Sequence, residues 1–422
     1  MQFKFDSVDF VFTRQKSFVV PRTEYKFQAG RDFLLAKRKH ISSLRSGSSE
    51  TIVCIICHEE ANPEDLVSLL CPEMHFVVCR GCVGDNKKNT DAVIECPFCI
   101  KKKRREEYHD EITEKLFSFQ AQQTLCLEIR PDMKIEAAEL TRETRVVLRN
   151  ISISDKLFLV LMSRTTVEIQ EGASLFKHHN GRKCCHEGLV EKTCGQIDID
   201  FGSFSTDDVE RIRENISIMP DNILHVKNIE SWVLADYTLE LLPKLKLHEE
   251  NEMKALKLKV THPNYMKRIL GAKNHSIWMG KVLNLKLYDY AVSLLAKLRF
   301  HDNNAMDELF LRADNPENII GISQTTDRSI WIGKVKELYV YYFGIEILPK
   351  LKIHEKNMMK EFWVIAKDPA EIAPLLRREK ESIPMSATDN LETNYITKEI
   401  MEKFSFPSGQ EREGGQEMFP FE

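Results

Sequence analysis

The chain has 422 residues, of which 42% are hydrophobic and 29% are charged. This balance is typical of a globular protein with sizeable buried cores, and the length allows roughly two to four domains. The formal net charge of −4 argues against a globally basic nucleic-acid-binding surface, and no apolar run is long enough to span a membrane. The opening segment MQFKFDSVDFVFTRQKSF is interrupted by charges and lacks the apolar core of a signal peptide, so we expect the cytoplasm or the nucleus.

Residues 1–50 form the first expected segment. They show no dependable helix or strand period, and they end in KRKHISSLRSGSSE, which is basic and then rich in Ser and Gly. Such a composition is typical of a linker. We therefore expect a basic N-terminal segment and linker that leads into the next domain.

Residues 51–105 contain seven of the eleven cysteines of the chain. In a reducing compartment, clustered cysteines indicate a metal site more often than disulfides. Zinc takes four ligands in a tetrahedron, so eight ligands serve two ions, and an ion with four protein ligands has no open position for catalysis. We expect two structural zinc ions and metal-dependent folding. The eight candidate ligands, in chain order, are Cys54, Cys57, Cys71, His75, Cys79, Cys82, Cys96 and Cys99.

This order of three Cys, one His and four Cys resembles the RING finger family. The resemblance implies a cross-brace, with Cys54, Cys57, Cys79 and Cys82 on one ion and with Cys71, His75, Cys96 and Cys99 on the other. It also implies a RING-type E3 ubiquitin ligase that binds a ubiquitin-loaded conjugating enzyme and accelerates transfer by orientation, with no nucleophile of its own. His58 is expected to be a solvated neighbour of the ligands.

The resemblance further implies an apolar docking groove for the conjugating enzyme, at Ile56, Pro97 and Phe98. Two residues depart from the pattern of many active members. Asn86 stands where an aromatic residue is common, and Ile100 stands where an arginine fork would hydrogen-bond ubiquitin and the conjugating enzyme together. A non-enzymatic RING scaffold that only binds partners is therefore an alternative to the ligase.

A run of five basic residues ends the RING region. It could be a nuclear localisation patch or the solvated start of a helix, and it also motivates a second alternative, a nuclear nucleic-acid-associated factor. Residues 106–123 are expected to form a helical linker. The run consists of Lys101, Lys102, Lys103, Arg104 and Arg105.

Residues 124–222 are expected to form a β-sandwich-like domain. The segments TLCLEIRP, RVVLRNISI, KLFLVLMS and TTVEIQ are short strand-like runs between polar turns, a pattern typical of an antiparallel sandwich. The region loosely resembles the major sperm protein type of immunoglobulin-like fold. Its segment KHHNGRKCCHEGLVEKTC carries no pair of well-spaced knuckles, so we expect incidental thiols and no third zinc site.

Residues 223–385 repeat with a period of 53, visible in LPKLKLHEENEM, LAKLRFHDNNAM and LPKLKIHEKNMM. Apolar pairs follow one another at alternating intervals of 24 and 29 residues, which predicts parallel strands stacked in chain order with helices between them. The pairs are Trp232/Leu234, Leu256/Leu258, Leu285/Leu287, Leu309/Leu311, Leu338/Val340 and Phe362/Val364.

This region resembles the leucine-rich-repeat-like part of the F-box-associated homology (FTH) proteins, although it lacks an Asn three residues after each apolar pair. Trp278 and Trp331 recur at the period and are expected in the core. His248, His301 and His354 also recur, but strands about 4.8 Å apart would hold them too far from one another to share a metal. Residues 386–422 are expected to be a disordered tail.

The sequence therefore predicts a multidomain α+β protein: a small two-zinc RING domain, a β-sandwich-like middle region and a leucine-rich-repeat-like α/β solenoid. The expected partners are a ubiquitin-conjugating enzyme at the RING domain and a protein substrate at the solenoid. Neither a membrane nor a nucleic acid is an expected partner of the ligase.

Overall fold

The structure is a computed structural model, and it describes 2–5, 7–21, 121–179, 183–189, 197, 199–227, 229–394 and 397–406. It also describes 52–54, 57–61, 66–69, 77–79, 81–82 and the single residues 107, 110, 114 and 117. The chain divides into two compact units. Unit 1 comprises 1–148, 164–168 and 179–187, and unit 2 comprises 149–163, 169–178 and 188–422. The described part mixes helices with sheets in which many neighbouring strands are parallel.

Unit 1 begins with an antiparallel meander that the sequence did not predict. β1 (Gln2–Lys4) pairs with β2 (Val8–Phe12), and β2 pairs with β3 (Ser17–Pro21). β3 then pairs antiparallel with β10 (Ala138–Leu140), which is parallel to β8 (Gln122–Gln123). Phe3, Phe10 and Phe18 are fully buried. These strands were not expected from the sequence, and their alternating phenylalanines form a sheet face with a core of its own. The linker expected at 37–50 lies outside the described residues.

The middle region does not pair as an antiparallel sandwich. β9 (Cys126–Glu128) is parallel to β11 (Arg145–Leu148), and β13 (Thr166–Ile169) lies on the other side of β11. In unit 2, β12 (Ile151–Ser154), β14 (Ser174–Phe176), β16 (Leu224–Val226) and β18 (Leu245–Leu247) also pair in parallel, in that order. Parallel neighbours need crossover connections, which a sandwich of hairpins does not contain.

One expected strand of the middle region is a helix. The run KLFLVLMS lies in α4 (Asp155–Arg164), where every residue from Leu157 to Ser163 is buried. The next α-helix described in this region is α5 (Thr206–Ile218). Ser205 caps it, and the Ser205 hydroxyl accepts a hydrogen bond from the Asp208 N–H. Between them lies β15 (Cys185–Glu187).

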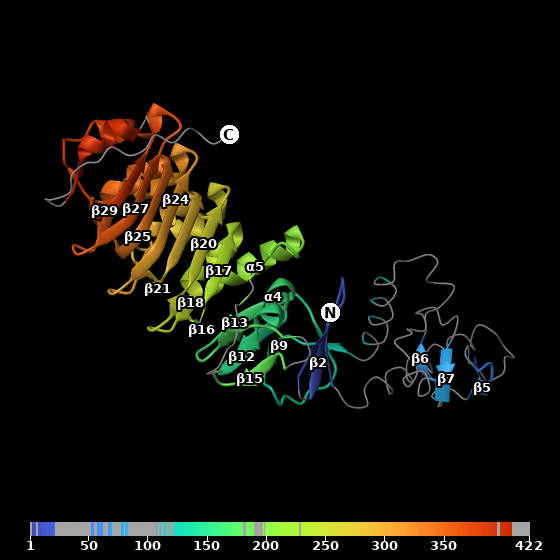
Figure 1. Ribbon diagram of the computed structural model, residues 1–422. Coiled ribbons are helices and arrows are strands. Elements are labelled where there is room, and N and C mark those ends of the chain that lie inside the picture. The colour runs from blue at the N-terminus through green and yellow to red at the C-terminus, as the bar shows by residue number, and fades with distance from the viewer. Residues whose placement is uncertain are drawn as a thin grey trace. The chain divides into compact units, whose positions relative to one another are not determined.

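A parallel ladder forms most of unit 2, and its strands lie side by side in chain order in Figure 1. The six predicted apolar pairs are in register with one another: Trp232 is opposite Leu256, Leu256 opposite Leu285, and the series continues to Phe362. The predicted parallel order is confirmed. The ladder comprises β17 (Ser231–Ala235), β20 (Ala255–Val260), β22 (Asn284–Asp289), β24 (Ala305–Ala313), β25 (Ile330–Tyr342), β27 (Met358–Ile365) and β29 (Ala387–Thr393).

β29 lies in the segment that was expected to be disordered. It pairs with β27, and the short strand β30 (Phe404–Ser405) pairs with β28 (Ile383–Pro384). Phe404 is fully buried and lies 5.8 Å from Phe362, measured between ring centroids. The expectation of disorder from 386 is therefore wrong for 387–394 and 397–406, which extend the ladder by one more strand.

A second set of short parallel strands accompanies the ladder. β19 (Glu252–Met253), β21 (Ile277–Val282) and β23 (Leu298–Phe300) pair in that order, and β26 (Leu351–Ile353) pairs with the first residues of β25. Trp278 and Trp331 lie here with partly exposed side chains, so their expected place in the core is wrong; Trp232 is the buried tryptophan.

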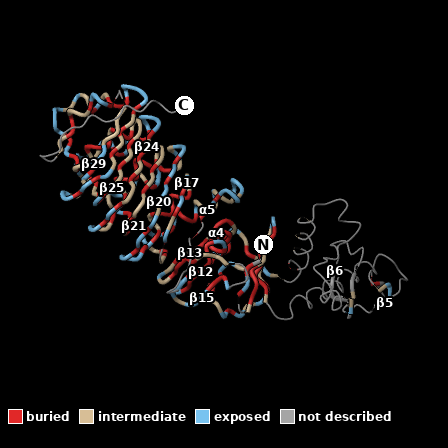
Figure 2. The backbone as a smooth tube through the Cα atoms, in the orientation of Figure 1, coloured by how far each residue is buried: buried red, intermediate tan, exposed pale blue. Residues whose placement is uncertain are grey.

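The connections between the strands contain helices, as the spacing predicted, and these helices are short and mostly of the 3₁₀ type. Leu239, Leu241, Leu294 and Leu295 on these helices are buried. Figure 2 shows buried residues alternating with partly or fully exposed ones along the strands. The helices are η2 (Asp236–Lys244), η3 (Pro263–Tyr265), α6 (Lys267–Leu270), η4 (Tyr290–Ala296), η5 (Pro316–Ile319), α7 (Ile320–Ser323), η6 (Phe343–Lys350), η7 (Pro369–Glu371), α8 (Ala373–Leu376) and η8 (Thr397–Lys403).

Candidate metal centre

Four cysteines of unit 1 come together although they belong to two separate stretches of sequence. Their Sγ atoms all lie within 4.8 Å of one another, and the residues are Cys54, Cys57, Cys79 and Cys82. The Sγ atoms of Cys57 and Cys79 are 3.8 Å apart, and the N–H of Cys79 donates to the Sγ of Cys54 at 3.4 Å. Cys54 is buried and the other three are partly exposed. The group could hold a metal ion.

Local backbone structure positions the first two thiols. β4 (Ile52–Val53) and β5 (Glu60–Ala61) form a small antiparallel hairpin around Cys54 and Cys57. The N–H of His58 donates to the Cys54 carbonyl at 2.9 Å, and the N–H of Cys54 donates to the Glu59 carbonyl at 2.9 Å. His58 adopts a φ of +57° to close this turn. A C-x2-C sequence in such a turn presents two thiols on the same side.

The other two thiols come from the end of a second hairpin. β6 (Leu66–Leu69) pairs antiparallel with β7 (Val77–Cys79), whose last residue is a member of the group. Gly81 and Cys82 follow in helical conformation. The strand end and the helical turn thus supply one thiol each.

The acidities of the thiols reflect their crowding. A backbone hydrogen bond from Glu59 lowers the pKa of Cys57, yet desolvation and the Cys54 thiol leave that pKa above its usual value. Desolvation and hydrogen bonds to the other three thiols raise the pKa of Cys82 to about 12. Four thiolates cannot share so small a space without a cation, and a bound metal ion would favour the deprotonated form.

The structure brings together one of the two ligand sets that the resemblance implies. His58 is exposed and is not a member of the group, as expected. The remaining predicted residues lie outside the described residues. They are the ligands Cys71, His75, Cys96 and Cys99, the docking residues Ile56, Pro97 and Phe98, the departures Asn86 and Ile100, and the basic run 101–105.

The second cysteine-rich segment forms no metal-holding group within the described ranges, although Cys194 falls outside them. Cys184 and Cys185 are buried, and His186 is exposed. The N–H of His178 donates to the Asp155 carboxylate at 2.8 Å. The expectation that this segment carries no zinc knuckle stays a prediction for its whole length.

The three periodic histidines serve as turn residues. The Nδ1 atom of each accepts the N–H two residues later, from Glu250, Asn303 and Lys356, at 3.0–3.2 Å. Each backbone carbonyl accepts the N–H of the residue three positions later, at 2.8–3.0 Å. None belongs to a metal-holding group among the described residues. The histidines are His248, His301 and His354.

The asparagines that these turns position were missed by the sequence reasoning. The Oδ1 atom of Asn304 accepts the Val282 N–H at 2.8 Å, and its Nδ2 donates to the Ile332 carbonyl at 3.1 Å. Asn357 makes both kinds of bond with Val335. The signal was available, because Asn251, Asn304 and Asn357 recur at 53 residues within the quoted repeats.

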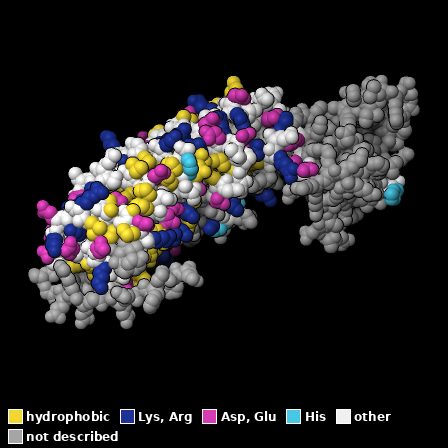
Figure 3. All heavy atoms as spheres, turned by 90° about the horizontal axis from the view of Figure 1, so that it is seen from above, with side chains coloured by type: hydrophobic (Ala, Val, Ile, Leu, Met, Phe, Trp, Pro, Cys, Tyr) yellow, Lys and Arg dark blue, Asp and Glu magenta, His cyan; other side chains and the backbone are white. Residues whose placement is uncertain are grey.

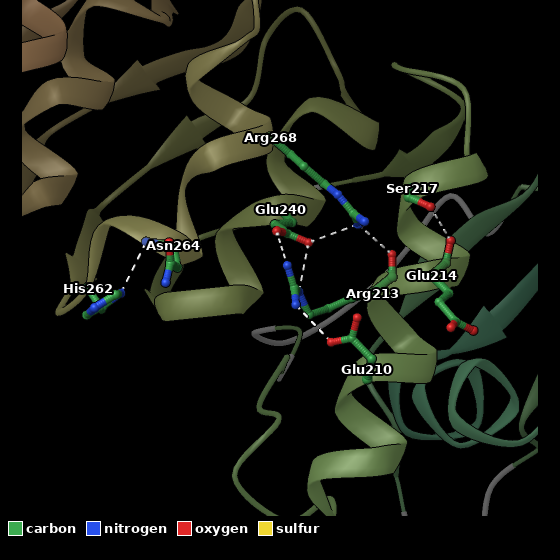
Figure 4. A network of polar contacts seen from close by, with 8 residues as sticks. All are labelled: Glu210, Arg213, Glu214, Ser217, Glu240, His262, Asn264 and Arg268. Atoms are coloured by element: carbon green, nitrogen blue, oxygen red, sulfur yellow. Dashed lines mark hydrogen bonds and ion pairs between the residues drawn. The ribbon is translucent and has the colours of Figure 1, made fainter.

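A buried ion-pair network is a second candidate site in unit 2 (Figure 4). Glu240 of η2 has a side chain only 1% exposed, and Arg213 of α5 pairs with it at 3.2 Å. Arg268 approaches the same carboxylate at 3.6 Å and donates to the Arg213 carbonyl at 3.0 Å. The Arg213 guanidinium also lies 3.9 Å from the centre of the Tyr237 ring.

This network is suited to structure and not to acid–base chemistry. Desolvation lowers the pKa of Arg213, but the Glu240 hydrogen bond and charge outweigh that effect, so the pKa lies above its usual value. The Glu240 carboxylate is held between two guanidinium groups, which balance its charge within the protein. We read the network as a link between α5, η2 and α6.

No protein-family model, curated protein or solved structure matches the chain. Among the described residues, no helix is both long and apolar enough to cross a membrane.

Proposed function

We propose that the chain is a RING-type E3 ubiquitin-protein ligase of the cytoplasm or nucleus. The observation that carries the proposal is the pairing of the Cys54/Cys57 knuckle with the Cys79/Cys82 knuckle. Cys71 and His75 lie between these knuckles in the sequence and belong to neither. A metal site made from consecutive knuckles would have used them. Joining Cys54/Cys57 to Cys79/Cys82 past Cys71 and His75 corresponds to the cross-brace that the resemblance to RING fingers implies.

Zinc is the metal that this donor set favours. Zn–S bonds of about 2.3 Å in a tetrahedron place the sulfur atoms about 3.8 Å apart. The Cys57 and Cys79 sulfurs are 3.8 Å apart. When bound, zinc supplies structural cross-linking of the two hairpins. The proposal assigns a second zinc ion to Cys71, His75, Cys96 and Cys99.

The proposed mechanism is catalysis by orientation. Ile56, Pro97 and Phe98 would form the apolar contact with the conjugating enzyme. Restricting the flexible ubiquitin conjugate to a reactive pose raises the rate of attack by a substrate lysine without any chemical step on the RING domain. Ile100 in place of an arginine fork predicts a weak ligase.

The parallel ladder of unit 2 would present the protein substrate. Its in-register strands at alternating spacings support the interpretation as a leucine-rich-repeat-like solenoid, in which neighbouring units bury a shared core. The resemblance to FTH proteins points in the same direction, because F-box proteins are themselves substrate receptors of ubiquitin ligases.

A lysine-discharge assay tests the ligase activity. The full chain is mixed with free lysine and a panel of ubiquitin-loaded conjugating enzymes, alongside Ile56→Ala and Ile100→Arg. We expect weak discharge by the wild type, none by Ile56→Ala and faster discharge by Ile100→Arg, with unchanged zinc content in each. If the wild type and Ile100→Arg both equal the protein-free control with every enzyme, the ligase proposal fails and a zinc-dependent scaffold replaces it.

The scaffold is the second candidate because Asn86 and Ile100 both depart from the pattern of active members. A nucleic-acid factor has less support. It would need basic side chains clustered over a surface. On the face that Figure 3 presents, Lys and Arg side chains alternate with Asp and Glu side chains.

A further inference from the structure

The outward-facing side of the ladder carries an unusual number of aromatic side chains. Residues between the inward-facing apolar pairs point away from the core, because successive side chains of a strand alternate between its faces. At these positions the strands β22 to β27 carry aromatic residues with partly exposed side chains. These are Tyr288, Phe310, Tyr339, Tyr341 and Trp363.

The aromatic rings contact one another across the strands. Phe310 is opposite Tyr339 in register, and Tyr339 is opposite Trp363. The ring centroids of Tyr339 and Trp363 are 5.8 Å apart, and those of Phe310 and Tyr341 are 5.2 Å apart. These distances lie within the range of about 4.5–7 Å in which aromatic pairs stabilise one another.

At the β22 and β24 end, the chain provides its own cations for these rings. The Lys257 ammonium lies 5.1 Å from the centre of the Tyr288 ring, and the Lys286 ammonium lies 6.0 Å from that of Phe310. Lys286 also pairs with Glu308 at 2.7 Å. Tyr288, Phe310 and Glu308 therefore each have an internal basic partner.

At Tyr339 and Trp363 the same arrangement lacks its cations, whereas Tyr342 at the end of β25 has Arg312 at 5.2 Å and Lys367 at 3.9 Å from its ring centre. Glu308, Glu337 and Glu361 stand in register on three neighbouring strands. Among the described residues, neither Glu337 nor Glu361 has an ion-pair partner, and no Lys or Arg side chain lies over Tyr339 or Trp363. Two carboxylates and two rings are left without the partners that their equivalents have.

The Tyr339 hydroxyl lies within hydrogen-bond distance of both carboxylates and has one proton to donate between them. It lies 2.7 Å from the Oε2 atom of Glu361 and 3.1 Å from that of Glu337. Burial and the Glu361 hydrogen bond raise the pKa of Tyr339 above its usual value, so the hydroxyl keeps its proton. The Oε1 atom of each glutamate has no hydrogen-bond partner among the described residues, and these oxygens can accept bonds from another molecule.

We propose that Glu337, Tyr339, Glu361 and Trp363, the aromatic–acidic patch, bind an Arg- or Lys-containing extended segment of a protein partner. One basic side chain would pair with the two carboxylates, whose strands lie about 4.8 Å apart, and its alkyl stem and charge would lie against the rings. This inference deepens the proposed function, because it names the chemistry of the substrate.

Peptide binding to the full chain tests the patch without any ubiquitin transfer. The probe is a fluorescein-labelled decapeptide of alternating Arg and Ser, with Gln–Ser and Glu–Ser decapeptides for comparison, measured by fluorescence anisotropy. We expect saturable binding of the Arg–Ser peptide only, weakening as salt is added. The double variant Glu337→Gln/Glu361→Gln should lose about tenfold in affinity.

The matched control is Glu249→Gln/Glu250→Gln, which makes the same change in net charge at two exposed residues of another part of unit 2. It should bind as the wild type does. Trp363→Leu should also weaken binding while its urea unfolding curve shows a folded protein. Absence of saturable binding, or equal affinity of the two double variants, would overturn the proposal.

Light scattering identifies a different occupant. If the wild type self-associates and Glu337→Gln/Glu361→Gln is monomeric, the patch binds a second copy of the chain and the proposal of a separate partner is wrong. Since discharge of ubiquitin to free lysine needs no substrate, a failed peptide assay leaves the ligase proposal intact. Conversely, a failed discharge assay would leave the proposal of peptide binding at the aromatic–acidic patch standing.

Discussion

Gly333 lies so close to the backbone of Asn304 that a Cβ atom at Gly333 would stand 2.2 Å from the Asn304 carbonyl oxygen. The same oxygen accepts the Lys334 N–H at 2.9 Å, and Gly333 adopts a φ of +83°. Gly280 repeats the relationship with Asn251 at 2.3 Å. Consecutive turns of unit 2 are thus stacked through a contact that only glycine allows.

Gly333→Ala should destabilise unit 2 by roughly 2–4 kcal/mol, because it adds a clash with backbone to an unfavourable φ. Urea unfolding of the full chain, followed by tryptophan fluorescence, measures the change. Gly271→Ala is the control: Gly271 has a φ of −69°, and an added Cβ would meet only the Arg268 carbonyl, at 3.3 Å. Equal losses for the two variants would contradict the stacking argument.

Asn304→Ala should cost roughly 2–4 kcal/mol of unfolding free energy. The change leaves the buried Val282 N–H and Ile332 carbonyl without their partners, at about 1–3 kcal/mol for each unsatisfied group. The neighbouring exposed residue gives a matched control, since only the backbone of Asn303 is hydrogen-bonded, to His301. Thermal unfolding of Asn304→Ala and Asn303→Ala, side by side, should show a large shift for the first alone.

Metal content should follow the cysteine group. The full chain should contain two zinc ions by elemental analysis, one of them lost in Cys57→Ser, because three remaining thiols leave the tetrahedron incomplete. Cys126→Ser, at an exposed cysteine outside the group, should keep both ions. Chelation should unfold residues 51–105 and leave the ladder intact. Zinc-free, reduced and undamaged wild-type protein would refute the metal site.

Acidification should weaken unit 2 through His225. Burial first, and then the charges of Lys246 and Lys227, lower the pKa of His225 below its usual 6.5. The unfolded chain therefore takes up a proton at a higher pH than the folded one. The contribution of His225 is present above the unfolded pKa and is lost as the pH falls through the folded pKa.

The loss of unfolding free energy between pH 7 and pH 5 should be smaller in His225→Asn than in the wild type. His262→Asn serves as the control, because His262 is exposed and Asn can replace it as the cap of η3. An unchanged pH dependence in His225→Asn would show that His225 is not one of the groups responsible.

The register of the ladder could be predicted because it follows from a local signal. Apolar residues at alternate positions mark an inward face, and their fixed spacing aligns Leu285 with Leu309 and Leu309 with Leu338. The grouping of Cys54 and Cys57 with Cys79 and Cys82 could likewise be predicted, from the order of the ligands in the sequence. In both cases the information is carried by positions in the sequence.

Other features depend on packing that no single segment specifies. The run KLFLVLMS is apolar on every side, so its period cannot separate a buried helix from a strand. Parallel pairing of β12 and β14 depends on the path of the chain between them. The meander of 2–21 has a readable alternation, in Phe3 and Phe5 and then in Val8, Phe10 and Phe12, which the charged residues among them obscure.

β25 belongs to two sets of strands at once. Its first residues pair with β26, and its later residues pair with β24 and β27. Loss of this strand would therefore open both layers together, whereas fraying of β19 or β30 opens one. Slow amide hydrogen exchange should centre on β25, and the cooperativity of unit 2 should be greatest there, with local unfolding spreading inward from the two ends of the ladder.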